Sequence, residues 1–191
     1  MAKPVRAFVA FPCPPRLQAA LAEALGAWRD TDAAVRWADP ERIHLTLRFL
    51  GDDADPDRLE HLDSGLAGAA AAAPPVAVWP DATGAFPGWG RPRVLWLGLL
   101  DEGALTPLAG RVEEAARKAG FPAEDRPFRP HLTLGRVKAP SGLDPVLEDL
   151  RAWRPETGTE TLDELIVYRS ELGPAGARHE ALARHRLGGA S

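Results

Sequence analysis

Two identical tetrapeptides, HLTL at 44–47 and at 131–134, carry the residues of this chain best suited to chemistry. In a β-strand, residues two apart point to the same face, so His44 projects with Thr46 and His131 projects with Thr133. Because the unperturbed pKa of histidine is about 6.5, one imidazole can accept a proton near neutral pH while the other delivers one. Two threonine hydroxyls between them can donate hydrogen bonds to developing negative charge. The set therefore suits displacement at phosphorus, with a proton carrier at each end.

A metal site is the main chemical alternative, because histidine is a common metal ligand. Two histidines with paired threonines lack the third histidine or carboxylate that a catalytic zinc site usually has. Asp39, Glu41 and Asp125 lie near the two motifs in sequence, but none has ligand spacing, and Cys13 is the single cysteine. We therefore predict chemistry without a metal or a cofactor, and we interpret Cys13 as a structural residue.

The elements that must position these residues occur in two successive passages. The first passage is predicted as a strand over 5–11, a helix to about residue 29, a strand over 42–51 ended by Gly51 and a helix over 55–73. A strand beginning at 76–80 follows, and then a glycine- and proline-rich loop or bent connection over 81–92. The second passage is predicted as a strand over 93–100, a helix over 105–116, a strand over 129–137 and a helix over 143–153, with two more strands over 162–172 and 179–187.

The spacing of the motifs indicates an internal duplication. His44 and His131 are 87 residues apart, and the segments RAFVAF and RVLWLG, which begin at Arg6 and Arg93, have the same separation. A single repeat of this length indicates a duplicated half rather than a solenoid. Two such halves can place equivalent residues face to face, so we predict one α+β domain over 1–191. It is bilobal, with duplicated strand–helix–strand halves at about 5–80 and 92–172 and a C-terminal strand at about 179–187.

Composition limits the partners and the location. The 191 residues carry a formal net charge of −4, which argues against a broad nucleic-acid-binding surface but allows a small anionic substrate. No apolar run approaches the roughly 20 residues that span a bilayer. We expect a cytoplasmic protein that acts as a monomer, without a membrane or an obligate protein partner.

Motifs along almost the whole chain carry a resemblance to a known family: RAFVAF, HLTLRFLG, PRVLWLGL, RPFRPHLTLGR and SELGPAGARHEAL. In these the sequence resembles the two-histidine (2H) phosphoesterase superfamily, and within it the RNA 2′,3′-cyclic phosphodiesterases, historically called 2′-5′ RNA ligases. The resemblance implies a bilobal α+β fold in which antiparallel sheets line a central cleft and helices lie outside. It also implies metal-independent hydrolysis of a 2′,3′-cyclic phosphate, on an RNA end or a nucleotide, to a 2′-phosphomonoester.

The resemblance also implies roles for single residues. His44 is expected to be the general acid and His131 the general base, although near-symmetry makes the roles exchangeable on the sequence alone. Thr46 and Thr133 are expected to hold the phosphate. Arg136 matches a phosphate contact of the family, but strict alternation puts it on the face opposite His131, so we predict a bulge or strand end that turns it.

Other residues are secondary candidates. Alternation places Arg48 on the face of His44, and His179 stands where the family often has tyrosine, which puts a nucleotide contact there in doubt. Among the aromatic residues, Phe86, Trp89 and Phe128 are candidates for the cleft border, while Trp37, Phe49, Trp96 and Trp153 are expected in the core. His61 and His185 are expected to be structural.

Two other functions stay open from the sequence. The same site can act on ADP-ribose cyclic phosphate or on a 2′-5′-linked oligonucleotide. Alternatively, the chain is a non-catalytic module that binds RNA ends, although binding alone does not need two proton carriers.

Overall fold

The fold comes from a computed structural model and is described for residues 3–31, 34–139, 143–173 and 176–188. Its helices are α1 (Pro15–Thr31), α2 (Pro56–Ala71), α3 (Leu105–Lys118), α4 (Asp144–Ala152) and the short 3-10 helix η1 (Pro40–Arg42). Its strands are β1 (Val5–Pro12), β2 (Val35–Trp37), β3 (His44–Ala54), β4 (Val76–Phe86), β5 (Val94–Asp101), β6 (His131–Val137), β7 (Glu160–Leu162), β8 (Glu164–Gly173) and β9 (Gly176–Arg186).

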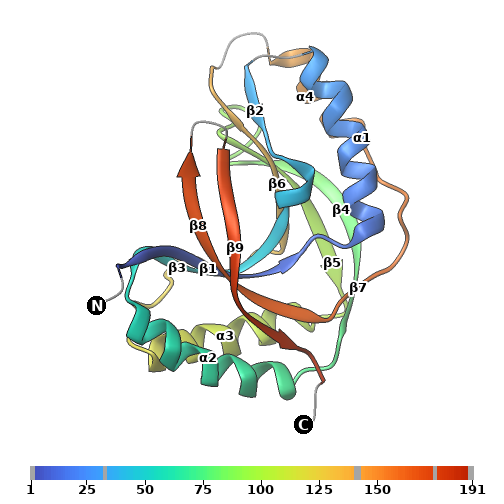
Figure 1. Ribbon diagram of the computed structural model, residues 1–191. Coiled ribbons are helices and arrows are strands. Elements are labelled where there is room, and N and C mark those ends of the chain that lie inside the picture. The colour runs from blue at the N-terminus through green and yellow to red at the C-terminus, as the bar shows by residue number, and fades with distance from the viewer. Residues whose placement is uncertain (1–2, 32–33, 140–142, 174–175, 189–191) are drawn as a thin grey trace.

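The strands form one curled sheet in the order β7-β4-β5-β6-β3-β1-β8-β9, with β2 paired to β6. Helices α1 and α4 lie at one end of the molecule, and α2 and α3 lie at the other (Figure 1). The predicted α+β class is confirmed, and the strands are joined into a single sheet. The junction is the antiparallel pairing of β3 with β6, at Leu45 and Leu132.

Each end of the molecule takes helices from both halves of the sequence. Helix α1 follows β1 along the chain, but its Trp28 packs against Trp37 of β2 and Trp153 after α4, with ring centroids 5.3 Å apart in both pairs. Helix α3 follows β5, but it lies beside α2 at the other end (Figure 1). The helices of the two sequence halves are therefore mixed, so neither end of the molecule corresponds to one half of the sequence.

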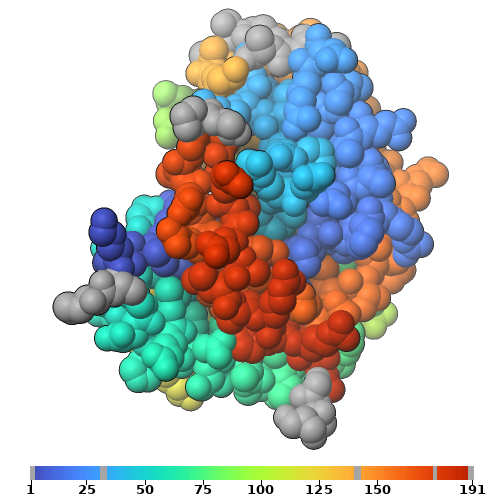
Figure 2. Space-filling view, in the orientation of Figure 1, coloured from blue at the N-terminus to red at the C-terminus, as the bar shows by residue number. Residues whose placement is uncertain are grey.

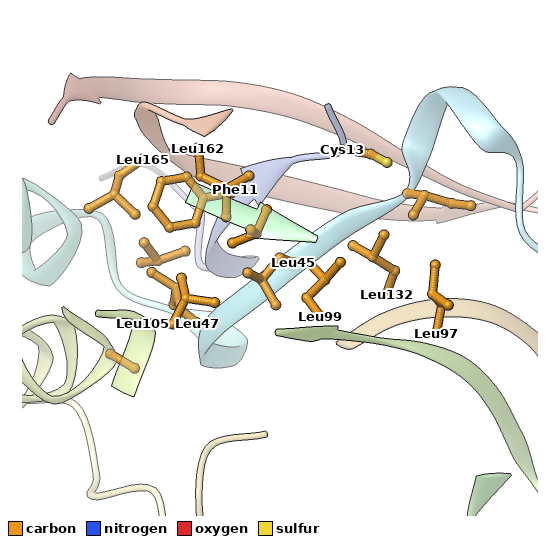
Figure 3. Packing of buried hydrophobic residues seen from close by; sticks show 14 of the residues in the cluster. Phe11, Cys13, Leu45, Leu47, Leu97, Leu99, Leu105, Leu132, Leu162 and Leu165 are labelled. Carbon is orange, nitrogen blue, oxygen red and sulfur yellow. The ribbon is translucent and has the colours of Figure 1, made fainter. Parts of the chain in front are cut away.

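The leucines of the two tetrapeptides anchor the histidine strands in the core. Leu45, Leu47, Leu132 and Leu134 are all buried. Leu45 and Leu132 lie in the buried cluster with Leu97 and Leu99 of β5, while Leu47 lies toward Leu105 of α3 (Figure 3). Burial of this apolar face stabilises both strands and fixes which face their histidines occupy.

Several predicted boundaries were wrong. Strand β3 does not end at Gly51 but runs to Ala54. Gly51 adopts a φ of +120°, a conformation that glycine tolerates, and the strand continues through an irregular part of the β1–β3 pairing. Residues 81–86, expected as a loop or bent connection, continue β4, and residues 83–86 pair with β5 after a register shift. The short strands β2 and β7 were not predicted, because three residues give too little periodicity to recognise.

Candidate functional site

The pairing of β3 with β6 brings both histidine–threonine pairs onto one face. Because Leu45 lies opposite Leu132 in an antiparallel pair, His44 stands beside Thr133 and Thr46 beside His131. Directly opposite residues have Cβ atoms about 5 Å apart, and diagonal neighbours are about 7–8 Å apart. All four side chains are half-buried, with the core leucines on the opposite face. The two imidazoles therefore occupy opposite corners of a small four-residue patch.

Both imidazoles are held in the same way. The Nδ1 of His44 lies 2.8 Å from the carbonyl oxygen of Arg42, and the Nδ1 of His131 lies 2.7 Å from that of Arg129. A carbonyl oxygen only accepts, so Nδ1 carries the proton and donates it in each ring. In each histidine this leaves Nε2 as the nitrogen that can exchange a proton with a substrate.

The electrostatic surroundings of His44 disfavour its charged form. Burial lowers the pKa of His44 to about 4, the hydrogen bond to the Arg42 carbonyl opposes this, and His179 and His131 lower it further. In the free protein, His44 is therefore held neutral near pH 7.

Aromatic rings surround His44. Phe8 of β1 stacks on its imidazole with centroids 4.5 Å apart, and Tyr168 of β8 stacks on Phe8 at 5.2 Å, with its own centroid 6.3 Å from that of His44. His179 of β9 meets the His44 ring edge-on at 5.2 Å. Burial lowers the pKa of His179, as do Arg42 and Arg6. His179 thus lies at the candidate site itself. Sequence reasoning left it in doubt, and only the pairing of β8 with β9 brings it there.

A different aromatic pair supports His131. Phe86 of β4 meets its ring edge-on at 5.2 Å, and Trp96 of β5 lies 6.2 Å away. Phe86 was a candidate for the cleft border and does lie beside His131. The expectation that Trp96 fills the core was wrong, because Trp96 pairs with Thr133 on the site face. Its ring occupies the space where a Cβ of Gly84 would be.

Both histidine strands carry a β-bulge at the last leucine of the tetrapeptide. Leu95 pairs with Gly135 and Trp96 with Thr133, so Leu134 is the extra residue on β6. Leu134 and Gly135 are both buried, and the next residue, Arg136, is exposed. The bulge thus places Arg136 on the same face as His131 and Thr133. A bulge or strand end that turns Arg136 in this way was predicted from the sequence.

The same bulge in β3 corrects the interpretation of Arg48. Val9 pairs with Arg48 and Ala10 with Thr46, so Leu47 is the extra residue. Arg48 therefore turns away from His44 and is buried, with its Nε 2.5 Å from a carboxylate oxygen of Glu113 on α3.

Phe49 takes the place on the site face that Arg136 takes in the other half. The guanidinium of Arg6 lies over its ring, 4.5 Å from the centroid. The expectation that Phe49 fills the core was wrong for the same reason, because the bulge turns it outward.

A cavity of about 300 Å³ opens beside His44, between the segment 41–44 and the β8–β9 hairpin. Tyr168, Arg178 and His179 line this cavity. Arg42 connects its two walls by donating a hydrogen bond of 2.9 Å to the carbonyl oxygen of Ala177. Figure 2 shows the hairpin in red beside the cyan segment around η1. The site thus has a recess on the His44 side.

The remaining candidates have structural contacts. Trp89 and Phe128 are partly buried against the core, and Trp89 also packs against Arg151. His185 lies 3.0 Å from Asp63, in keeping with a structural role. Burial raises the pKa of the Cys13 thiol to about 12, which makes it a poor nucleophile.

The described residues contain neither a metal-binding cluster nor a membrane-spanning helix. No group of three or more histidine, cysteine, aspartate or glutamate side chains in this part of the chain is placed to hold a metal ion. None of the helices there is both long and apolar enough to cross a membrane.

Comparison with known proteins agrees with this geometry. The sequence profile of the 2′-5′ RNA ligase superfamily matches residues 13–174. An RNA 2′,3′-cyclic phosphodiesterase of Methanothermobacter thermautotrophicus is 30% identical over 184 residues, which cover 96% of this chain and 99% of the relative. The crystal structure of TT0787 of Thermus thermophilus matches with a TM-score of 0.81 at 28% identity, over 96% of this chain and 98% of that one. The structure of E. coli LigT complexed with 3′-AMP matches with a TM-score of 0.73 at 27% identity, over the same 96% and 98%.

A curled antiparallel sheet that presents two histidine–threonine pairs on one face defines a 2H phosphoesterase. Within that class, the family match over most of the chain is decisive: this protein belongs to the 2′-5′ RNA ligase superfamily.

Proposed function

We propose that the protein hydrolyses a terminal 2′,3′-cyclic phosphate, on RNA or a nucleotide, to a 2′-phosphomonoester without a metal or other cofactor. One observation carries the proposal. On one face of the sheet, two imidazoles anchored through Nδ1 stand diagonally across two threonine hydroxyls. The name of the M. thermautotrophicus relative and the nucleotide bound to the LigT structure support the substrate class.

In the proposed reaction the phosphate lies over Thr46 and Thr133. Nε2 of His131 removes a proton from water, which attacks phosphorus in line with the bridging 3′-oxygen. Nε2 of His44 delivers a proton to that oxygen as its bond to phosphorus breaks. The threonine hydroxyls donate hydrogen bonds to the phosphate oxygens, where negative charge increases in the transition state, and Arg136 adds a positive charge.

The lowered pKa of His44 sets a requirement for this assignment. A general acid must hold a proton, yet burial keeps His44 neutral in the free protein near pH 7. An anionic phosphate placed against the ring favours the imidazolium and raises its pKa. Substrate binding is therefore coupled to proton uptake at His44. If His44 is instead the base, no such uptake is needed.

Product analysis tests the proposal. The protein, in excess EDTA, is incubated with 2′,3′-cyclic AMP, ADP-ribose cyclic phosphate and a 2′-5′-linked dinucleotide, and the products are separated by chromatography. We expect 2′-AMP to form from the cyclic nucleotide at a rate that EDTA does not change. A 3′-phosphate product, or loss of activity on chelation, would contradict the mechanism. Preferred turnover of either other substrate would keep the site and change its substrate.

A further inference from the structure

We propose that Arg36, directly opposite Arg136 on the neighbouring strand, forms a second anion subsite, which binds the phosphodiester on the 5′ side of the terminal nucleotide. The inference rests on the proposed function and adds to it a preference for RNA ends over mononucleotides. Arg136 is known from the sequence pattern, but nothing in the tetrapeptides points to Arg36. It comes into view only because the short strand β2 pairs with β6.

The first support is an uncompensated pair of like charges. Arg36 and Arg136 are directly opposite each other on the antiparallel strands β2 and β6. Like charges in this position destabilise a strand pair. Both side chains are exposed, and neither guanidinium makes an ion pair or hydrogen bond to any described residue. Two adjacent arginines that no carboxylate neutralises attract an anion, even in a chain with a net charge of −4.

The second support is the face on which the pair lies. The bulge at Leu134 puts Arg136 on the face of His131 and Thr133. Trp37 and Val35, the neighbours of Arg36 on β2, are buried on the other face. Arg36 therefore projects beside Arg136, on the same side of the sheet as the candidate site.

The third support is the order of side chains along β6. Strands β3 and β2 lie end to end along the same edge of β6, with β3 paired at Leu132 and β2 paired over Gly135–Val137. Along β6 from His131, the next pair of facing residues on this side of the sheet is His44 with Thr133. The pair after it is Arg36 with Arg136. The two arginines thus lie beyond His44, on the side away from His131.

This order matches the chemistry of an RNA end. In the proposed reaction His44 protonates the 3′-oxygen, so the ribose lies on the His44 side of the phosphate. The chain then continues through the 5′ carbon to the preceding phosphodiester, further from His131. A monoanionic phosphodiester at this place would contact the guanidinium of Arg36, which presents several donors to phosphate oxygens, while Arg136 serves the reacting phosphate.

Three substrates with the same base test the subsite: adenosine 2′,3′-cyclic phosphate, the same compound with a 5′-phosphate, and the dinucleotide ApA ending in a 2′,3′-cyclic phosphate. We measure kcat/KM on each with the parent, Arg36→Gln, Arg36→Lys and Arg117→Gln. Arg117 is an exposed residue in the last turn of α3, and its substitution removes the same charge far from the site.

We expect the parent to prefer the two substrates that carry the additional phosphate. In Arg36→Gln the ratio of kcat/KM for the dinucleotide over the mononucleotide should fall about tenfold, and Arg36→Lys should keep part of it. The salt dependence of log kcat/KM on the dinucleotide should lose a slope of about 0.7, the value for one contact to single-stranded nucleic acid. Arg117→Gln should change neither quantity.

Two outcomes would overturn the inference: a parent that treats all three substrates alike, or an Arg36→Gln variant that keeps the parent ratio. A parent inactive on every cyclic phosphate would instead contradict the proposed function, so the two failures are distinguishable.

Discussion

The two histidine strands share one construction but occupy different surroundings. In each strand the imidazole donates through Nδ1 to the carbonyl two residues earlier, and a bulge falls on the last leucine of HLTL. Around His44, three rings from β1, β8 and β9 enclose the imidazole, and burial lowers its pKa. Around His131, the contacts come instead from Phe86 of β4 and Trp96 of β5. The duplication thus keeps the geometry of the proton carriers while their surroundings diverge.

The largest expected effect tests whether both halves are needed. His44→Ala and His131→Ala should each lower kcat on 2′,3′-cyclic AMP by about 10²–10⁴-fold, because each removes a proton carrier. Circular dichroism should show that both variants fold. His61→Ala, on the exposed face of α2, is the matched control and should retain the parent rate. A fully active variant at either motif would show that its histidine lacks the assigned role.

The residues after the two bulges give a second contrast, in stability. Arg48→Met should lower the free energy of unfolding by about 3 kcal/mol, because it leaves Glu113 and Glu124 without their buried cation. Arg126 pairs with the same Glu124 from an exposed position, so Arg126→Met should cost less than about 1 kcal/mol. Urea denaturation measures both. Equal losses would mean that Arg48 is no more important to the fold than a surface charge.

A smaller effect concerns the aromatic support of His131. Gly84→Ala places a methyl group where the Trp96 ring lies, so the ring must shift, at a cost of about 1–3 kcal/mol, and the position of His131 must adjust. Gly68→Ala on α2 meets nothing within 4 Å and should be neutral or stabilising. Thermal melts and initial rates of both variants check this. Unchanged stability in Gly84→Ala would show that this packing is loose.

A further expected effect is the pH dependence of stability. The folded-state pKa of His44, about 4, lies below its unfolded value of about 6.5, so the unfolded chain binds the proton more readily. The stabilisation is therefore complete above about pH 6.5 and is lost as the pH falls toward 4. His44→Gln should flatten this part of the pH profile in urea denaturation. A parent profile that the substitution leaves unchanged would show that His44 is not held neutral by the fold.

Periodicity and composition predicted much of the architecture. Alternation in HLTL predicted both histidine strands and their buried leucines, and the 87-residue spacing predicted a duplicated α+β chain. The direct pairing of β3 with β6 was beyond the sequence, because strand neighbours are set by long-range packing. The bulge in β6 was predicted from Arg136, but the bulge in β3 was not, so simple alternation assigned Arg48 to the wrong face. Phe49 and Trp96 were expected in the core because strand aromatics usually fill it, yet both lie on the site face. That the chain acts as one bilobal domain, as a monomer and in the cytoplasm stays a prediction.

The most direct test of unequal roles is the pH dependence of the residual activity in His44→Asn and His131→Asn. With kcat/KM measured on 2′,3′-cyclic AMP in EDTA, the His131→Asn profile should report the remaining acid alone and fall as the pH rises above about 4, the pKa of His44. The His44→Asn profile should report the remaining base and rise with pH to a plateau. Slopes of the opposite sign would mean that His44 is the base and His131 the acid. Two identical profiles would contradict separate acid and base roles for the two histidines.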